Sequence, residues 1–160
     1  MSAQKLLQSC RDSGLKLVVA ESLTGGALAA ELVAVPGASD VFAGGIVAYD
    51  SKLKVSELGV ASSLIEAPGP VSLEVATQMA LGARNLVANS LGCSEREVLA
   101  IATTGVAGPT EQGARVGKVF VAVALGEQLL AFEHHFEGDR NEIRAAAVVA
   151  ALEHANDLFV

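Results

Sequence analysis

The sequence predicts an α/β fold in which helices cover a mixed central sheet. In the first half of the chain, short apolar runs alternate with amphipathic helical stretches, a pattern typical of parallel strands joined by helices. In the second half, strand-like segments at 118–125 and 129–136 are joined by Gly126 and Glu127, which predicts an antiparallel hairpin. Because both kinds of pairing are expected, the sheet is predicted to be mixed.

Each element of the first half follows from its local pattern. Leu6, Leu7 and Cys10 share one face of a first helix. The next apolar run is too short for a core helix and indicates a buried strand, and Pro36 with Gly37 closes the helix that follows it. The elements expected here are a helix ending at 12–14, a strand at 15–20, a helix at 27–35, a strand at 42–49 and a helix at 51–58 capped by Gly59.

The second half begins with a turn cluster at 67–70 and a long amphipathic helix whose predicted N-cap is Ser72. A buried strand then runs into a Gly-rich loop, the hairpin follows, and Asp139 is the predicted N-cap of the last helix. The elements expected are a helix after Ser72, strands at 98–103, 118–125 and 129–136, and a helix from 139 to the end of the chain. We see no internal repeat or flexible linker, so residues 1–160 are predicted to form one domain.

Composition narrows the classes of function. Hydrophobic residues make up 51% of the chain and charged residues 18%, which is enough apolar material for one packed core. The formal net charge of −7 argues against a nucleic-acid partner, because phosphate backbones are bound by basic surfaces. Aromatic residues make up only 4%, which argues against a surface that stacks single-stranded bases. A local anion site stays open, because a few Arg side chains and backbone N–H groups can hold one phosphate.

The chain is expected to be cytoplasmic and to have no membrane contact. Cys10 and Cys93 lack metal-type spacing and are expected to be free thiols in a reducing compartment. The stretch 1–14 is polar and amphipathic, unlike a signal peptide. No segment reaches the ~20 continuous apolar residues that a membrane span needs.

The first candidate site segment lies between the strand at 15–20 and the helix at 27–35. Ser22 and Thr24 supply hydroxyls there, and Gly25 and Gly26 let backbone N–H groups face a ligand. A hydroxyl beside such amides can attack a carbonyl while the amides hold the oxyanion. Helix capping is the structural alternative, since Ser or Thr before Gly-Gly is common at helix N-termini.

A second segment combines Tyr49, the only tyrosine, with Lys52 and Lys54. A lysine whose pKa is lowered by desolvation can accept the proton of a serine at neutral pH, whereas the structural alternative for either lysine is a solvated helix face. The third segment, 103–109, offers hydroxyls and glycines after a strand but lacks the Lys of a nucleotide-triphosphate loop.

Arg140 and Arg144 lie four residues apart near the start of the last helix, where two guanidinium groups and the helix dipole suit a phosphate. Surface pairing with nearby glutamates is the alternative. His134 and His135 are adjacent in a strand and therefore point to opposite faces, while His154 is predicted to be isolated on a helix. No metal site is predicted. Glycines interrupt the strand at 42–49, and we expect something to approach the backbone closely there.

Together these segments resemble the C-terminal amidase domain of CinA, a family that also occurs alone as the PncC-type nicotinamide-nucleotide amidase. Each motif is weak by itself, but their order and spacing through nearly the whole chain are specific. The matching residues are Ala20 to Gly26, Tyr49 with Lys54, Leu58 to Val60, Gly69 to Ser72, Thr104 to Pro109, Val116 with Gly117, Phe136 to Arg140, and Ile143 with Arg144.

The resemblance implies a three-layer α/β/α sandwich that is commonly a homo-oligomer. It implies a hydrolase that converts the carboxamide of nicotinamide mononucleotide into nicotinic acid mononucleotide and ammonia, a step of NAD salvage that needs no cofactor. Many members have Cys where this chain has Leu23. The nucleotide pyrophosphatase activity associated with the N-terminal domain of full-length CinA is not expected here.

Carried over by position, Ser22 is the nucleophile, Lys54 is its general base, and Tyr49 helps to orient the pair. Thr104 is expected to bind or polarise the substrate. The residues expected to bind substrate are Glu21, Thr24, Gly25, Gly26, Gly45, Gly105, Val106, Ala107 and Gly108. Arg140 and Arg144 are expected to bind the phosphate because of their spacing on the last helix, not because of the resemblance.

Two other functions stay open. One is a non-catalytic nucleotide-binding or regulatory module linked to competence or DNA damage, and the other is hydrolysis of a different carboxamide. The presence of both Ser22 and Lys54 favours the enzyme, because a binding module needs only the Gly-rich loops and the arginines.

Overall fold

The computed structural model describes residues 2–111 and 113–159 and contains a five-stranded sheet in the order β2-β1-β3-β4-β5. The three strands β2, β1 and β3 are parallel, and β4 and β5 continue the sheet in antiparallel pairing. This confirms the predicted mixed sheet and hairpin. The strands are β1 Lys16–Glu21, β2 Phe42–Val47, β3 Val98–Gly105, β4 Lys118–Leu125 and β5 Gln128–His135.

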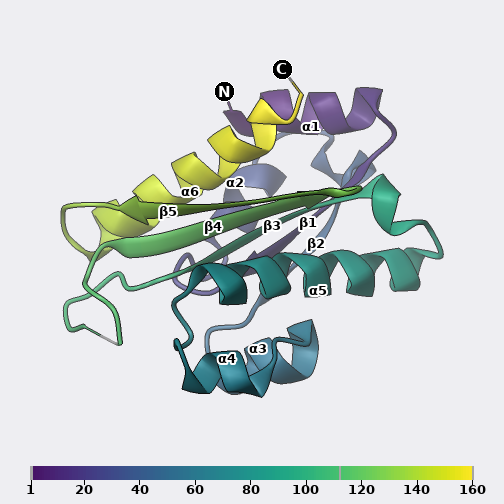
Figure 1. The fold of residues 1–160 in the computed structure, drawn as a ribbon. Coiled ribbons are helices and arrows are strands. Elements are labelled where there is room, and N and C mark those ends of the chain that lie inside the picture. The colour runs from purple at the N-terminus through teal and green to yellow at the C-terminus, as the bar shows by residue number, and fades with distance from the viewer. Residues whose placement is uncertain (1, 112, 160) are drawn as a thin grey trace.

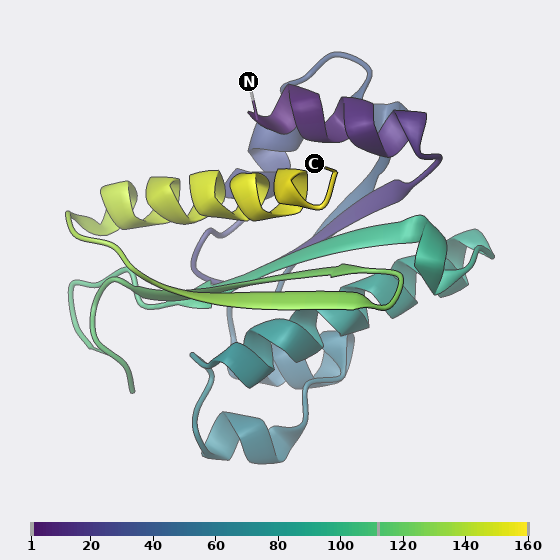
Figure 2. The same cartoon turned by 45° about the horizontal axis from the view of Figure 1, so that its top comes forward.

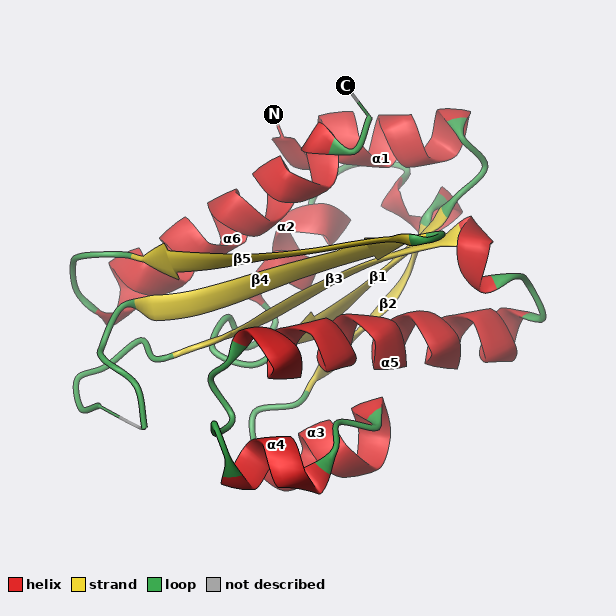
Figure 3. Ribbon diagram, in the orientation of Figure 1, coloured by secondary structure: helices red, strands yellow, loops and turns green. Residues whose placement is uncertain are grey.

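Helices cover both faces of this sheet, as Figures 1 and 3 show. One face carries α1 (Ser2–Asp12), α2 (Ala27–Val33) and α6 (Arg140–Asp157). The other face carries α5 (Leu73–Leu91), with α3 (Ser51–Leu58) and α4 (Ser62–Glu66) packed beyond it. The turned view in Figure 2 shows the same three layers, with the sheet between α6 and α5. The α/β/α sandwich is therefore confirmed.

Alternation along the strands explains why the sheet has two cores. In β1, Leu17 and Val19 face the layer of α1, α2 and α6, whereas Val18 and Ala20 face α5. All four side chains are fully buried, which accounts for the continuous apolar run in the sequence. The two edge strands contain no fully buried residue: β2 alternates between half-buried and exposed residues, and β5 is exposed over its first three residues.

Small residues let α3 lie against α5. A Cβ added at Gly82 of α5 would stand 1.9 Å from the Leu58 carbonyl oxygen at the end of α3. No side chain fits at Gly82, so the two helices are in direct backbone contact. This contact matters for function, because α3 carries one of the candidate catalytic residues.

Several boundaries differ from the predicted ones. The strand β2 ends at Val47, so Tyr49 lies in the loop after it, and β3 continues to Gly105, so Thr104 is a strand residue. The helix α4 was not predicted. It has only five residues and none of them is buried, so it shows no apolar stripe that a sequence pattern could reveal. Short 3₁₀ helices at Ala38–Asp40 and Glu95–Glu97 were also not predicted.

The parallel strands bring the candidate loops to one edge of the sheet. Glu21 at the end of β1 pairs with Thr103 of β3 and with Val47 of β2. Beyond this register, the Ser22 N–H donates to the Thr103 carbonyl at 2.9 Å. The loops that follow the three parallel strands therefore converge at their carboxyl ends, where open α/β sheets bind ligands.

Candidate active site

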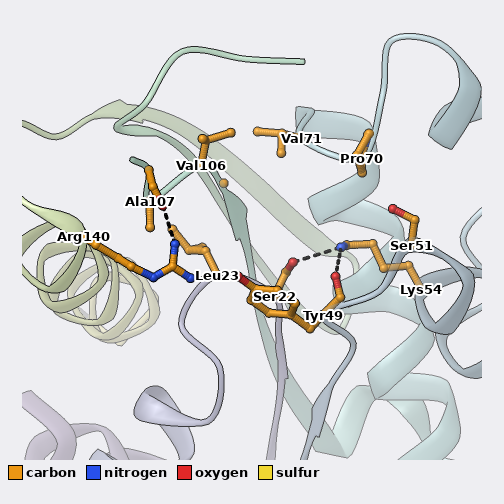
Figure 4. A pocket seen from close by; sticks show the side chains of 12 residues that line it. Ser22, Leu23, Tyr49, Ser51, Lys54, Pro70, Val71, Val106, Ala107 and Arg140 are labelled. Atoms are coloured by element: carbon orange, nitrogen blue, oxygen red, sulfur yellow. Dashed lines mark hydrogen bonds between the residues drawn. The ribbon is translucent and has the colours of Figure 1, made fainter. Parts of the chain in front are cut away.

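A small pocket lies where these loops meet (Figure 4). Its walls come from the loops after β1, β2 and β3, from the segment before α5, and from the first residue of α6. The residues that line it are Ser22, Leu23, Tyr49, Ser51, Lys54, Pro70, Val71, Gly105, Val106, Ala107, Gly108 and Arg140. The three segments selected from the sequence thus share one cavity.

Ser22 and Lys54 are in direct contact at the base of this pocket. Lys54 Nζ donates a hydrogen bond to Ser22 Oγ at 2.9 Å, and the residues are 2% and 7% exposed respectively. Lys54 reaches this place because it lies on the inner side of α3, one turn before the buried Leu58. The helix begins at the N-cap Asp50, whose side chain accepts from the Lys52 N–H at 2.8 Å. Lys52 itself is exposed, as a solvated helix face predicts.

Burial controls the charge of the lysine. Desolvation lowers the pKa of Lys54, and the nearby Asp50 carboxylate opposes this shift by favouring the charged amine. Among the described residues, Nζ has one other hydrogen-bond partner, the main-chain carbonyl of Tyr49 at 3.5 Å, and a neutral dipole compensates a charge poorly. The site therefore favours an amine that gives up its proton more readily than an ordinary lysine.

Glu21 holds the loop that carries Ser22. Its buried carboxylate accepts from the N–H groups of Gly26, Leu28 and Ala29 at 2.9, 3.1 and 2.9 Å. These are the free N–H groups at the start of α2, so the carboxylate takes the place that a bound anion would occupy. Glu21 was expected to bind substrate. Both of its oxygens are instead used to fix the loop, and it does not line the pocket.

Two further contacts fix the same loop from other sides. Thr24 Oγ1 lies 2.8 Å from Thr103 Oγ1, with both residues buried, which ties the loop to β3. Arg144 donates from Nε to the Leu23 carbonyl at 3.0 Å and from Nη2 to the Thr24 carbonyl at 2.8 Å. Arg144 was expected to bind phosphate, but its guanidinium is occupied by main-chain oxygens and is not among the lining groups.

Arg140 stands at the rim of the pocket. Its Nη2 donates to the hydroxyl of Tyr49 at 2.8 Å, and its Nη1 donates to the carbonyl of Gly108. Arg140 is exposed, and Figure 4 shows its guanidinium reaching toward Ala107 and Leu23. It is therefore a cation that an incoming anion can reach. The Tyr49 side chain bonds to Arg140 rather than to the dyad, so it is the Tyr49 main chain that touches Lys54.

The loop after β3 is the third wall. Thr104 is buried and its Oγ1 donates to the Pro70 carbonyl at 2.9 Å, which joins this wall to the segment before α5. Thr104 does not line the pocket. Gly105 has to be glycine, because a Cβ there would stand 2.7 Å from the Lys118 carbonyl oxygen. Val106, Ala107 and Gly108 line the cavity, as expected of this loop.

Other predicted positions lie elsewhere. Gly45 is in β2, where an added Cβ would stand 2.8 Å from Val19 Cγ2 and 3.4 Å from Ala29 Cβ. The expected close approach is thus present, but it is made by the core and by α2 rather than by the pocket. Gly25 and Gly26 have left-handed φ angles of 59° and 96° and shape the turn after Ser22 without lining the cavity.

The prediction that His154 is isolated was wrong. Its Nε2 lies 2.9 Å from Nε2 of His134, and its ring stacks on Phe132 with centroids 3.6 Å apart. The pairing joins β5 to α6, two elements that the sequence pattern could not place against each other. In residues 2–111 and 113–159, no group of three or more His, Cys, Asp or Glu side chains is arranged to hold a metal ion. Nor is any helix of that described part long and apolar enough to cross a membrane.

Sequence reasoning missed Ser51 as a pocket residue. Its position directly after the N-cap of α3 places it at the cavity, beside Tyr49 and Lys54. Pro70 and Val71 were noted only as part of a turn and a motif, and they form a wall. The available signal was the position of these residues at helix starts: Ser51 is the first residue of α3, and Pro70 and Val71 directly precede Ser72, the N-cap of α5.

Comparison with known proteins identifies the family of this chain. The family model of the CinA C-terminal domain matches residues 1–159. A CinA-like protein of Frankia casuarinae is 44% identical over 138 residues, which cover 86% of this chain and 30% of that protein. A CinA-like protein of Geobacter metallireducens is 41% identical over 146 residues, covering 89% of this chain and 33% of that protein. The chain thus spans about one third of the length of these curated relatives.

Solved structures show the same fold. The competence/damage inducible protein CihA from Agrobacterium tumefaciens superposes with a TM-score of 0.90 at 33% identity, covering 99% of this chain and 94% of that one. A CinA superfamily protein from Enterobacter cloacae gives a TM-score of 0.90 at 28% identity, covering 99% and 90%. With the family model matched over the whole described chain, this protein belongs to the CinA C-terminal domain family.

Proposed function

We propose that this protein is an amidohydrolase that converts nicotinamide mononucleotide into nicotinic acid mononucleotide and ammonia through an acyl-enzyme on Ser22. The observation that carries the proposal is the 2.9 Å contact between Ser22 Oγ and the buried amine of Lys54. Membership of the CinA C-terminal domain family, which includes PncC-type amidases, supports it. An amide bond needs a nucleophile, a proton carrier for the leaving amine and donors for the oxyanion, and this pocket offers candidates for each.

In the proposed first half-reaction, neutral Lys54 accepts the Ser22 proton while Oγ attacks the carboxamide carbon. The carbonyl π electrons move to oxygen and give a tetrahedral oxyanion. When the C–N bond breaks, Lys54 returns the proton to the departing nitrogen. The products of this step are ammonia, the ester of Ser22 with the nicotinoyl nucleotide, and a neutral lysine.

In the second half-reaction, water replaces the serine as nucleophile. Lys54 accepts a proton from the water as its oxygen attacks the ester carbon, and then returns that proton to Ser22 Oγ as the ester bond breaks. The product is the free acid, which loses its proton to solvent at neutral pH and then carries a carboxylate where the substrate carried an amide.

Arg140 is the proposed partner of the substrate phosphate. Among the described residues that line the pocket, it alone has a fixed positive charge, and its position at the rim suits a group several bonds away from the carboxamide. Arg144 is assigned elsewhere because it bonds to main-chain carbonyls of the loop after β1 and does not line the pocket. The N-terminus of α2 is likewise occupied by Glu21, so it does not compete for the phosphate.

The experiment that tests the proposal measures ammonia released from nicotinamide mononucleotide by the purified protein. Ser22→Ala and Lys54→Ala are each expected to lower kcat by several orders of magnitude, because dyad members act as a unit. Lys52→Ala is the matched control, since this exposed lysine lies on the same helix outside the pocket and is expected to leave the rate unchanged. Full activity of Ser22→Ala contradicts the assigned nucleophile.

Comparing nicotinamide mononucleotide with its riboside and with nicotinamide identifies the substrate class. A preference for the phosphorylated compound that Arg140→Ala abolishes is expected. Thermal stabilisation by the mononucleotide without any ammonia release instead favours the non-catalytic nucleotide-binding or regulatory module. Assembly into a homo-oligomer stays a prediction, and light scattering of the purified protein checks it.

A further inference from the structure

The guanidinium of Arg144 spans two successive carbonyl groups of the nucleophile loop, defined here as residues 22–26. It donates to the Leu23 oxygen from Nε and to the Thr24 oxygen from Nη2, at 3.0 and 2.8 Å. The partners are 121 and 120 positions away in the sequence, so a side chain of α6 holds the loop after β1. A planar fork bonded to two neighbouring carbonyls fixes the orientation of both peptide groups.

Fixing a carbonyl also fixes the N–H of the same peptide group. A trans peptide is planar, with its C=O and N–H pointing in opposite directions. Because Arg144 holds the Leu23 carbonyl, the Thr24 N–H is directed away from Arg144. The Gly25 N–H donates to the Ser22 carbonyl at 3.1 Å, and that bond turns the Leu23 N–H to the opposite side. Among the described residues, these N–H groups of Leu23 and Thr24 have no acceptor.

We infer that Arg144 is a positioning residue that orients the N–H groups of Leu23 and Thr24 as the oxyanion hole for attack by Ser22. Its bond to the Leu23 carbonyl orients the Thr24 N–H directly. Its bond to the Thr24 carbonyl fixes the Gly25 N–H, which holds the Ser22 carbonyl and so orients the Leu23 N–H. The inference rests on the proposed function only in taking Ser22 as the nucleophile. Leu23 lines the pocket directly beside Ser22, and a donor on the residue after the nucleophile is well placed for the oxygen of the attacked carbonyl. A flipped Leu23–Thr24 peptide would present a carbonyl dipole there and repel the developing charge.

The rest of the loop is built to keep this orientation. Gly25 has a φ of +59°, and a Cβ there would stand 3.7 Å from Arg144 Nη2, so the guanidinium lies directly over this glycine. Glu21 holds the N–H groups that begin α2, and Thr24 Oγ1 is bonded to Thr103. The side chains around the loop thus fix its termini and its carbonyls but leave the two N–H groups free.

The test uses two acyl donors, nicotinamide mononucleotide and p-nitrophenyl acetate, of which the second has no phosphate. Arg144→Ala is expected to lower kcat for the nucleotide by about 10²-fold with little change in KM, and to slow Ser22-dependent cleavage of p-nitrophenyl acetate by a similar factor. Guanidinium chloride at millimolar concentration is expected to restore part of the lost rate, whereas equal sodium chloride does not. Arg144→Lys replaces the planar guanidinium by a single ammonium group, and its kcat is expected to lie between those of the wild type and Arg144→Ala.

A phosphate-binding role gives the opposite pattern. If Arg144→Ala raises KM for the nucleotide alone and leaves both kcat and p-nitrophenyl acetate cleavage unchanged, the inference is overturned. If Arg144→Ala does not unfold cooperatively on heating, the same comparison of kcat, KM and p-nitrophenyl acetate cleavage is made with Arg144→Lys. If the wild-type protein cleaves p-nitrophenyl acetate through Ser22 but releases no ammonia, the proposed substrate is wrong. The role of Arg144 is then still tested with p-nitrophenyl acetate. If the protein is inactive with both compounds, the proposed amidohydrolase function and the role of Arg144 are both overturned.

Discussion

Lys54 Nζ and Ser22 Oγ lie 2.9 Å apart, and they come from two elements that meet only through packing. Ser22 follows the central strand β1, whose position is fixed by pairing with β2 and β3. Lys54 is on α3, which is held over the strand ends by its backbone contact with Gly82 of α5. The contact therefore depends on the sheet register at one side and on helix packing at the other.

The rate of ammonia release is predicted to increase with pH as Lys54 loses its proton. Because burial lowers the pKa of Lys54, the midpoint is expected below the pKa of an ordinary lysine. A profile of kcat/KM against pH measures this midpoint. Asp50→Asn removes the carboxylate that favours the charged amine and is expected to move the midpoint lower still. A midpoint at or above the ordinary lysine pKa contradicts the role of Lys54 as base.

The lowered pKa of Lys54 also predicts that the stability of the fold depends on pH. Since the pKa of Lys54 is lower in the folded protein, the unfolded chain binds more protons at pH values between the folded and the unfolded pKa. The free energy of unfolding is therefore expected to rise with pH across that window, and below it the folded state carries the full penalty for a buried charge. Urea denaturation at a series of pH values, with Lys54→Met as the control that lacks this rise, checks the prediction.

Tyr49→Phe is predicted to change substrate binding more than chemistry. The tyrosine hydroxyl accepts from Arg140, while its main-chain carbonyl is what approaches Lys54, and the substitution removes only the first contact. We expect KM for nicotinamide mononucleotide to rise by about fivefold, equivalent to one hydrogen bond of about 1 kcal/mol, with kcat nearly unchanged. Steady-state kinetics separate the two parameters. A kcat reduced a hundredfold would restore the dyad-orienting role that the family resemblance implies.

Gly82→Ala is predicted to impair the site from a distance. The added Cβ has to push the Leu58 carbonyl away, which displaces α3 and Lys54 with it. We expect a loss of about 1–3 kcal/mol in the free energy of unfolding, together with a lower kcat, despite the higher helix propensity of alanine. Urea denaturation and the ammonia assay measure the two effects. Ser90→Ala, an exposed change on the same helix, is the control and should alter neither.

Much of the fold could be predicted because its signals are local. Continuous apolar runs indicate strands such as Lys16–Glu21 that are covered on both faces, and Gly126 with Glu127 marks the hairpin. The helix α4 gave no such signal, since it buries none of its residues. The close packing at Gly82 could not be predicted either, because the carbonyl that it accommodates belongs to a different helix.

The sequence predicted which residues lie at the candidate site better than it predicted the role of each residue. Ser22, Lys54 and Arg140 were selected and all line one pocket. Lys52 and Lys54 are equivalent by local pattern, and only the family resemblance favoured Lys54. Glu21 was assigned to the substrate by its position in the family motif, and Arg144 by its place with Arg140 near the start of the last helix. Their partners are instead main-chain groups of the nucleophile loop and of the start of α2. Such partners are set by tertiary packing, so the spacing of residues in the sequence does not reveal them.

The most direct test of the central claim is rapid-quench mass spectrometry of the protein mixed with nicotinamide mononucleotide. The account predicts a transient ester of the nicotinoyl nucleotide on the peptide that contains Ser22, absent from Ser22→Ala and from Lys54→Ala. Ammonia release at the wild-type rate by Ser22→Ala, with no adduct on any peptide, would contradict it.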